Sequence, residues 1–201
     1  MSLDAIILDL GNVLAFHDNT KLFAEMARYW DTTPEAMKTR LEGGLWERVN
    51  RGQLPGDSLR VELVQRLGKD ITPAAWVELW TCHFTLNEPM INMVEFLAGQ
   101  AKLVLLSNTH DQHVSWLKPR LPVLARFDAL VFSCEVGLIK PEKAIYEKAL
   151  AAAGTLPWKT VFFDDVKAYA TAATQLGMHG RVFTTVEQFT EDLAKLGFKA
   201  G

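Results

Sequence analysis

The sequence predicts an α/β protein in which a doubly wound, Rossmann-like sheet of five parallel strands carries a small all-helical domain after its first strand. Short apolar runs alternate with helix-like segments over residues 102–197, which is the pattern of parallel strands joined by helices. Residues 13–99, in contrast, contain no run that indicates a strand. The long strandless stretch therefore predicts an insertion between the first and second strands.

Five apolar runs are the expected strands. Each is continuous rather than alternating, as in strands that are covered on both faces. They are AIILDL (5–10), KLVLLS (102–107), ALVFS (129–133), TVFFDD (160–165) and RVFT (181–184).

The expected core helices carry the usual end signals. In the segment 140–154, Pro141 lies near the start and Gly154 lies at the end, where helices commonly have these residues. The expected helical segments of the core are EPMINMVEFLAGQ (88–100), KPEKAIYEKALAAAG (140–154), ATAATQLG (170–177) and TEDLAKLG (190–197).

The insertion is expected to contain about four amphipathic helices. These are DNTKLFAEMARYW, PEAMKTRLEGGLWERV, PGDSLRVELVQRLG and TPAAWVELWTCHF. We expect a helical cap domain over residues 16–86, with residues 1–15 and 87–201 forming the core. An insertion at this point lies over the carboxyl ends of the strands, where open α/β sheets bind ligands, so it is a candidate lid.

Composition excludes several classes of protein. The 201 residues carry a net charge of −3 with no basic block, which argues against a nucleic acid or an anionic membrane as partner. Two cysteines, Cys82 and Cys134, provide neither a disulfide framework nor a metal-binding spacing, which fits a reducing compartment. No apolar run approaches the ~18 residues of a membrane span. We expect a cytoplasmic monomer or homodimer that acts on a small molecule.

Four polar clusters follow the first four expected strands. They are Asp9-Leu10-Gly11-Asn12, Ser107-Asn108-Thr109, the GLIKPE segment with Lys140, and Asp164-Asp165. In a parallel sheet these clusters meet at one edge, so three carboxylates share a small space with one lysine. Two carboxylates ~4 Å apart repel by about 4 kcal/mol at an effective dielectric of 20. Hard oxygen ligands favour Mg²⁺ as the compensating cation, and a free oxygen of Asp9 can then attack phosphorus.

Each cluster taken alone has an ordinary structural explanation. Asp9 could open a turn, Ser107 or Asn108 could cap a helix, and Lys140 could be a solvated residue at a helix start. The Asp164-Asp165 pair could also cap the helix that follows it. All four clusters in this order, each after a different strand, favour a shared site.

These motifs resemble a known family. LDLGNVL, LLSNT, GLIKPE and FFDD are similar to the four ordered motifs of the haloacid dehalogenase superfamily, most of all to its glucose-1-phosphate phosphatases and the phosphatase domains of soluble epoxide hydrolases. The resemblance covers the whole chain, and the set of motifs is more specific than any one of them. We expect the strand order 5-4-1-2-3, numbered along the chain.

The resemblance implies a role for each motif residue. Asp9 is then the nucleophile that forms an aspartyl-phosphate, and it also binds Mg²⁺ together with the Gly11 carbonyl and Asp165. Asp164 supports the metal from the neighbouring position. Ser107 and Asn108 hold the transferring phosphoryl group, and Lys140 offsets its charge. The expected activity is hydrolysis of a small phosphorylated metabolite.

The sequence departs from the family pattern at Gly11. Most phosphatases of this superfamily have a second aspartate there, which protonates the leaving group and activates water, and such a group is worth ~10²–10⁴ in rate. Three interpretations follow. The protein is a phosphatase with an easy leaving group such as a sugar-1-phosphate, a 2-haloacid dehalogenase, or a weakly active or inactive relative that binds a phosphorylated ligand. Asp164-Asp165 argue against the second interpretation, and the intact motif residues argue against the third.

Other residues are candidates for the missing proton transfer and for substrate binding. His17, His110 and His113 are expected near strand ends, and His110, beside the SNT motif, is the preferred substitute for the aspartate. Asn12, His17, Trp46 and His110 are the candidate substrate-binding residues. Tyr169 stands four residues after Asp165, where related phosphatases usually have Asn or Asp, so metal affinity is expected to be weaker.

Overall fold

Five parallel strands form the central sheet of the computed structural model, which describes residues 3–198. The strands are β1 (Ala5–Leu8), β4 (Lys102–Ser107), β5 (Ala129–Phe132), β6 (Thr160–Asp164) and β7 (His179–Val182). They lie in the order β5-β4-β1-β6-β7, so the first strand of the chain is central. An α/β fold with a five-stranded parallel sheet is therefore confirmed, and the motifs that follow β1, β4 and β6 lie at one edge.

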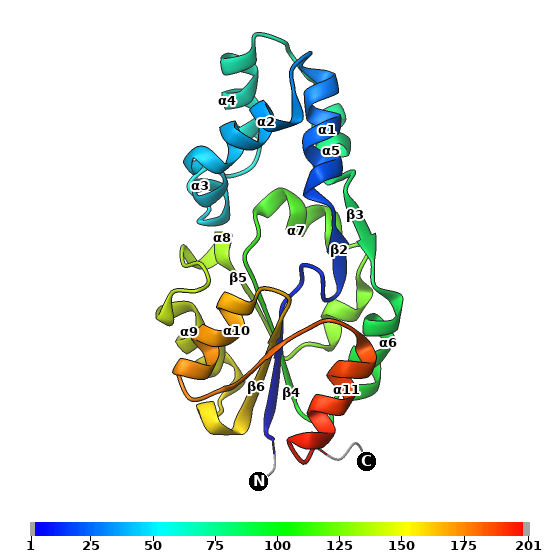
Figure 1. Ribbon diagram of the computed structural model, residues 1–201, viewed down its shortest axis with the longest axis vertical. Helices are drawn as coiled ribbons and strands as arrows, with labels where there is room; N and C mark the ends of the chain where they lie inside the picture. Colours follow the sequence, from blue (N-terminus) through cyan, green and yellow to red (C-terminus); the bar gives the residue numbers. More distant parts are fainter. Residues whose placement is uncertain (1–2, 199–201) are drawn as a thin grey trace.

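Helices cover both faces of this sheet, which explains why its strands are continuous apolar runs. Ile6 and Leu8 of β1 join a core cluster on one face, and Ala5 and Ile7 join a second cluster on the other. The first face is covered by α6 (Glu88–Leu97), α7 (Asp111–Leu117) and α11 (Val186–Lys195), and the second by α9 (Lys143–Ala153) and α10 (Lys167–Gln175). Figure 1 shows α9 and α10 on the side of the sheet opposite α6 and α11.

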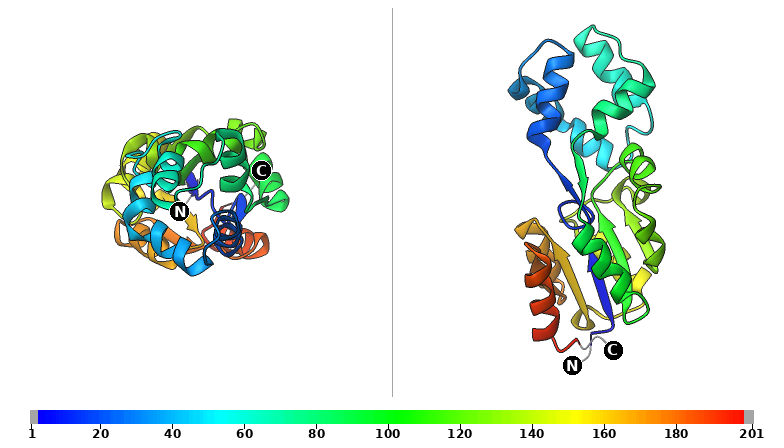
Figure 2. Two further views of the ribbon diagram at one scale, coloured as in Figure 1. Left: turned by 90° about the horizontal axis from the view of Figure 1, so that it is seen from above. Right: turned by 90° about the vertical axis from the view of Figure 1, so that its right-hand side faces the viewer.

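Residues 15–86 leave the sheet and form a separate helical body, called here the helical insert. It contains α1 (Asn19–Tyr29), α2 (Pro34–Arg40), α3 (Trp46–Asn50), α4 (Ser58–Leu67) and α5 (Pro73–Thr81). The side chains of Thr33 and Thr72 cap α2 and α5, and each of these helices begins with proline. Figures 1 and 2 show the insert beyond the end of the sheet that is opposite to both termini.

The insert has its own apolar core. Trp76 and Trp80 of α5 are buried and stacked at a centroid distance of 5.0 Å, and α1 packs Leu22 and Met26 against this cluster. Among residues 3–198, the sheet domain also contains short helical segments at α8 (Ser133–Val136), Pro122–Arg126 and Pro157–Lys159, and the insert contains one at Leu41–Leu45, between α2 and α3. Within residues 3–198, no helix has the length and apolar character needed to cross a membrane.

Two expectations about the insert were wrong. Residues 13–99 do contain strands, because β2 (Ala15–His17) and β3 (Phe84–Leu86) pair in antiparallel register and join the insert to the sheet. Three-residue strands are too short to show a periodic pattern. The expected second helix is also interrupted, since Gly43 and Gly44 leave the helical conformation between α2 and α3. Consecutive glycines make such a break inexpensive.

The last strand of the sheet begins two residues before the expected RVFT run. Its first residues, His179 and Gly180, pair with Val161 and Phe162 of β6. Gly180 is required by packing, because a Cβ at this position would lie 2.0 Å from the carbonyl oxygen of Ala170 in α10. Glycine is often a sign of a turn in a sequence, but Gly180 instead allows α10 to pack closely against β7.

The insert is docked against the sheet domain through polar and apolar contacts. A Cβ on Gly52 would lie 2.1 Å from the carbonyl oxygen of Cys134, so the two backbones are nearly in contact. Hydrogen bonds across the boundary join Trp76 Nε1 to Gln112, Trp80 Nε1 to His110, the Gly56 amide to Asp111, and the Arg51 guanidinium to Glu142 and the Gly137 carbonyl. The described conformation is therefore one in which the insert is closed over the sheet.

Candidate active site

Asp9 follows the last residue of β1 and lies at the centre of the site. Its backbone amide donates to the Phe163 carbonyl at 3.0 Å, which extends the β1–β6 pairing by one residue. The side chain is only 10% exposed, and Lys140 Nζ lies 2.8 Å from Asp9 Oδ1. The carboxylate that ends the first apolar run is therefore paired with a cation from a distant loop.

Lys140 is buried, and three oxygen atoms lie around its ammonium group. Its Nζ donates to Asp164 Oδ2 at 2.6 Å and to the Leu106 carbonyl at 3.1 Å, and it forms an ion pair with Asp9 Oδ1. The side chain is 1% exposed, so Lys140 acts as a fixed positive charge between two carboxylates.

Asn108 holds the Lys140 backbone in place. Its Nδ2 donates to the Lys140 carbonyl at 3.0 Å, and its Oδ1 accepts from the Lys140 amide at 2.8 Å. A similar pair of hydrogen bonds joins Thr109 to Ser133, whose hydroxyl accepts from the Thr109 amide and donates to the Thr109 carbonyl. The loop after β4 therefore positions the lysine as well as presenting the Ser107 side chain to the cavity.

The two aspartates after β6 face different partners. Asp164 is fully buried, and it accepts from Lys140 and from the Val166 amide at 2.8 Å. Asp165 is half-buried and accepts from Asn12 Nδ2 at 2.8 Å. Asp9, Asp164 and Asp165 each offer an oxygen atom, and the three oxygens lie within 4.8 Å of one another. These residues form an acidic cluster that one lysine does not neutralise.

The pKa values reflect this imbalance of charge. Burial raises the pKa of Asp9, against the lowering effect of Lys140. Burial, followed by repulsion from Asp9, raises the pKa of Asp164 to about 7. Burial alone would lower the pKa of Lys140, but the charges of Asp9 and Asp164 outweigh it and raise that pKa. The site therefore favours one more positive charge beside its carboxylates.

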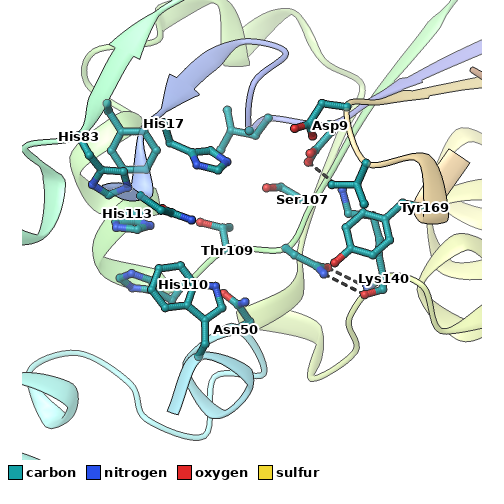
Figure 3. A pocket seen from close by; sticks show the side chains of 18 residues that line it. Asp9, His17, Asn50, His83, Ser107, Thr109, His110, His113, Lys140 and Tyr169 are labelled. Atoms are coloured by element: carbon teal, nitrogen blue, oxygen red, sulfur yellow. Dashed lines mark hydrogen bonds and ion pairs between the residues drawn. The ribbon is translucent and has the colours of Figure 1, made fainter. Parts of the chain in front are cut away.

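A cavity of about 240 Å³ opens beside Asp9, between the sheet edge and the helical insert. Figure 3 shows Asp9, Ser107, Lys140 and Tyr169 on one side of it and a group of histidines on the other. The polar and aromatic residues that line it are Asp9, His17, Asn19, Trp46, Asn50, His83, Phe84, Ser107, Asn108, Thr109, His110, His113, Lys140, Asp165 and Tyr169. Of the residues predicted from sequence to bind substrate, His17, Trp46 and His110 line the cavity.

Asn12 and His17 lie on a tight turn that follows Asp9. Asn12 has a φ of 52°, a left-handed conformation that asparagine tolerates, and its backbone amide donates to the Ala15 carbonyl at 2.8 Å. Asn12 Oδ1 accepts from the His17 amide at 3.1 Å, while its Nδ2 bonds to Asp165. The side chain of Asn12 is thus directed to other protein groups and is absent from the cavity lining, in contrast to the expectation that it binds substrate.

Histidines form the opposite wall, and Trp80 lies behind them. The Trp80 indole donates to His110 Nε2, and His113 Nε2 lies 3.2 Å from the Trp80 carbonyl. The rings of His110 and His113 have centroids 3.9 Å apart. Burial lowers the pKa of both histidines, and it lowers the pKa of His83 to about 4. This wall is therefore uncharged at neutral pH.

Several cavity residues had no recognisable signal in the sequence. His83 lies between α5 and β3, and Asn50 ends α3, so both come from parts of the insert whose approach depends on tertiary packing. Trp46 packs against Phe23 and Trp80 and also faces the cavity, so it belongs both to the packing of the insert and to the cavity lining. The Tyr169 ring lies 5.2 Å from Lys140 Nζ and covers the lysine.

Comparison with known proteins adds a family and several relatives. A sequence profile of haloacid dehalogenase-like hydrolases matches residues 3–177. The D-ribitol-5-phosphate phosphatase of Bacteroides thetaiotaomicron is 25% identical over 185 residues, which cover 86% of this chain and 87% of that protein. Bifunctional epoxide hydrolase 2 of Mus musculus is 42% identical over 99 residues, which cover 47% of this chain but only 18% of the larger mouse protein.

A solved structure has the same fold along nearly its whole length. It is the HAD family enzyme bt-2542 from Bacteroides thetaiotaomicron, crystallised as the wild-type protein in complex with magnesium and inorganic phosphate. The TM-score is 0.85 and the sequence identity is 21%, over 94% of this chain and 98% of that one. The likeness extends through the helical insert as well as the sheet, since both chains are covered almost entirely.

Proposed function

The chain belongs to the haloacid dehalogenase-like hydrolases, and from this premise we propose that it is a Mg²⁺-dependent phosphatase of small phosphorylated metabolites. The observation that carries the proposal is the cluster of three carboxylates with one buried lysine. Asp9 is a nucleophile candidate held by Lys140, and Asp164 and Asp165 add negative charge that the described residues do not balance.

The donor set fits Mg²⁺. The ion prefers hard oxygen ligands and commonly binds through one or two carboxylates plus substrate phosphate. Asp9, Asp164 and Asp165 present three oxygens within 4.8 Å of one another, and burial raises the pKa of Asp9 and of Asp164, so a cation bound beside them would favour their ionised forms. We propose Asp9, Asp165 and the Gly11 carbonyl as direct ligands and Asp164 as their support. Bound Mg²⁺ would neutralise charge on the phosphoryl group.

The protein residues would then perform the following chemistry. Asp9 attacks phosphorus and forms an aspartyl-phosphate, while the bond to the leaving oxygen breaks. Ser107 and Asn108, at the end of β4, hold the transferring phosphoryl oxygens, and Lys140 offsets negative charge from its fixed position. Water then attacks the phosphoryl group and releases Asp9. Catalysis rests mainly on positioning and electrostatics, as is general for phosphoryl transfer.

The cavity favours a small polyhydroxylated substrate such as a sugar or sugar-alcohol phosphate. Its volume of about 240 Å³ accommodates a compact ligand. The wall opposite Asp9 is uncharged but rich in hydrogen-bonding groups, and His83 Nδ1 is buried with no hydrogen-bond partner among the described residues. A substrate hydroxyl would satisfy such a group. Similarity to a D-ribitol-5-phosphate phosphatase supports this class, alongside the sugar-1-phosphates suggested by the sequence motifs.

The test is a panel of phosphorylated metabolites assayed with and without Mg²⁺, using wild type and Asp9→Asn. We expect phosphate release that requires Mg²⁺ and falls at least about 10⁴-fold in Asp9→Asn, which keeps the size of the side chain but removes the nucleophile. The panel includes sugar-1-phosphates, sugar-alcohol 5-phosphates and phosphorylated carboxylic acids. No release from any of them would overturn the proposal, and 2-haloacids would then be tested without metal.

A further inference from the structure

The imidazole of His17 lies near the carboxylate of Asp9, which directly follows β1. Gly11, which has no side chain, lies between these two groups. Gly11 is the second residue after Asp9, and a Cβ built on it would lie 3.1 Å from His17 Nε2, 3.2 Å from His17 Cδ2 and 3.8 Å from Asp9 Oδ2. The His17 ring therefore occupies the space into which a side chain at position 11 would extend. It follows that His17 Nε2 and Asp9 Oδ2 are separated by at most about 7 Å.

Resting on the phosphatase function proposed above, we propose that His17 transfers the proton in both chemical steps. Protonated His17 gives its Nε2 proton to the leaving oxygen as Asp9 attacks and the bond from phosphorus to that oxygen breaks, so the products of the first step are an alcohol, aspartyl-phosphate and neutral imidazole. In the second step neutral His17 takes a proton from water as the water oxygen bonds to phosphorus. The Asp9 carboxylate leaves, and inorganic phosphate and protonated His17 complete the cycle.

The separation suits this role. A nucleophilic oxygen approaches phosphorus to about 3–3.5 Å before reaction, and a proton donor lies about 2.8 Å from the oxygen it protonates. A span close to the upper limit of about 7 Å between Asp9 and the imidazole would accommodate the phosphoryl group and its leaving oxygen. Figure 3 shows His17 extending into the cavity between Asp9 and the other histidines, so its ring faces the place where such a group would lie.

The turn that carries His17 is built to hold the ring there. Asn12 Oδ1 accepts from the His17 amide at 3.1 Å, and Asn12 Nδ2 lies 3.4 Å from His17 Nε2 while donating to Asp165. On the other side, His17 pairs with Phe84 across β2 and β3, and its ring meets the Phe84 ring edge to face. Asn12 is therefore a positioning residue that ties the imidazole to the acidic cluster.

Other cavity residues are less suited to transfer this proton. Lys140 Nζ donates to Asp164 and to the Leu106 carbonyl and is paired with Asp9, so its charge is held between two carboxylates. His110, which sequence reasoning preferred, accepts from the Trp80 indole at Nε2 and has Nδ1 3.7 Å from Asp111. His113 is directed to the Trp80 carbonyl. Burial lowers the pKa of His17 as well, but the charge of Asp165 opposes that effect at this ring. His17 is thus the imidazole that lies near the nucleophile and lines the cavity.

A leaving-group comparison tests the proposal. p-Nitrophenyl phosphate releases a stable phenolate that needs little protonation, whereas an alkyl phosphate such as glycerol phosphate releases an alkoxide that needs a proton. In His17→Asn, we expect kcat/KM for the alkyl phosphate to fall about 10²–10⁴-fold and kcat/KM for p-nitrophenyl phosphate to fall less than about tenfold. Slow hydrolysis of the aspartyl-phosphate should appear as a burst of one p-nitrophenolate per active site, followed by a slow steady rate.

Two further variants make the test specific. His110→Ala should lower kcat/KM for both substrates by similar factors, because it changes the cavity wall without removing the proton donor. Adding Gly11→Asp to His17→Ala should restore activity on the alkyl phosphate, because the carboxyl group then enters the space that the imidazole vacated. Gly11→Asp alone should not increase activity, since its Cβ would lie 3.1 Å from His17 Nε2.

The outcomes separate this inference from the proposed function. Equal losses of kcat/KM on both substrates in His17→Asn, with no burst and with an unchanged far-ultraviolet circular dichroism spectrum, would overturn the role of His17 while leaving the phosphatase function intact. Failure of the double variant to recover at least tenfold over His17→Ala, when both proteins are folded, would also count against it. Wild-type protein that hydrolyses neither phosphate overturns the proposed function itself.

Discussion

Replacing Lys140 by methionine should destabilise the protein strongly, because it leaves two buried carboxylates without their cation. Methionine is of similar length and apolar, so it preserves packing around the side chain. Lys140 Nζ lies 2.8 Å from Asp9 Oδ1 and 2.6 Å from Asp164 Oδ2, and all three side chains are at least 90% buried. Removing one partner of a buried ion pair costs about 3–5 kcal/mol, which we expect at pH 8.5 without divalent metal.

The size of this loss should depend on pH. Burial already raises the folded-state pKa of Asp164 to about 7, above its ordinary value of 3.8, and removing Lys140 takes away a charge that lowers it. A carboxyl group whose pKa is raised by folding destabilises the folded state increasingly as pH rises from the unfolded pKa through the folded one. The loss in Lys140→Met should therefore be smaller at pH 6 than at pH 8.5, where both carboxylates would otherwise be ionised.

Urea unfolding followed by circular dichroism measures the effect, with EDTA present and then with Mg²⁺ added. Lys143→Met is the matched control, because Lys143 is 68% exposed and its pairing with Glu147 lies on the surface, where an ion pair is worth about 0–1 kcal/mol. Lys140→Met/Asp164→Asn should recover part of the lost stability by removing one buried charge. A loss below about 1 kcal/mol at pH 8.5, or a loss that is the same at both pH values, would refute the reasoning.

Three further predictions concern the insert, the histidine wall and the metal. Gly52→Ala should raise KM about tenfold or more by disturbing the docking of the insert, because its Cβ would lie 2.1 Å from the Cys134 carbonyl at a positive φ of 68°. Gly43→Ala, whose Cβ would have no atom within 4 Å, should leave KM unchanged. Equal KM values for the two variants would contradict this. Burial lowers the pKa of His83 from 6.5 to about 4, so the stability that the neutral imidazole contributes above pH 6.5 is lost as pH falls toward 4. In urea unfolding, the wild type should therefore lose about 3 kcal/mol more than His83→Phe over that pH range. Equal losses of stability in the two proteins would exclude this role of His83. Tyr169→Asn should lower the half-saturating Mg²⁺ concentration about tenfold by adding an outer-shell hydrogen bond, and a sub-millimolar value already in wild type would argue against the weak metal affinity expected from Tyr169.

The convergence of the motif residues follows from topology and was predictable. The carboxyl ends of parallel strands meet at one edge, so Asp9, Ser107 and Asp164 had to approach one another once their strands were recognised. The different orientations of Asp164 and Asp165 are also consequences of the strand, because successive side chains point to opposite faces. One therefore reaches Lys140 and the other reaches Asn12.

The position of His17 was not predictable in the same way. It depends on a left-handed turn at Asn12 and on pairing between β2 and β3, two three-residue strands in which the partners His17 and Phe84 are 67 positions apart in the sequence. The histidine wall has a similar origin, because His83 comes from the insert while His110 and His113 come from α7. Contacts between segments so distant in sequence leave no periodic signal, whereas strand ends do.

Closure of the insert and placement of Lys140 share the same loop. Glu142, two residues after Lys140, accepts from the Arg51 guanidinium of the insert and from the Ile139 amide of its own loop. The residue before Arg51, Asn50, lines the cavity. An ion pair on the surface contributes only about 0–1 kcal/mol, which is weak enough to break each time substrate enters. The close approach of Gly52 to Cys134 limits how far the insert can close, whereas the groups that contact Lys140 Nζ, which are Asp9, Asp164 and the Leu106 carbonyl, all belong to the sheet domain.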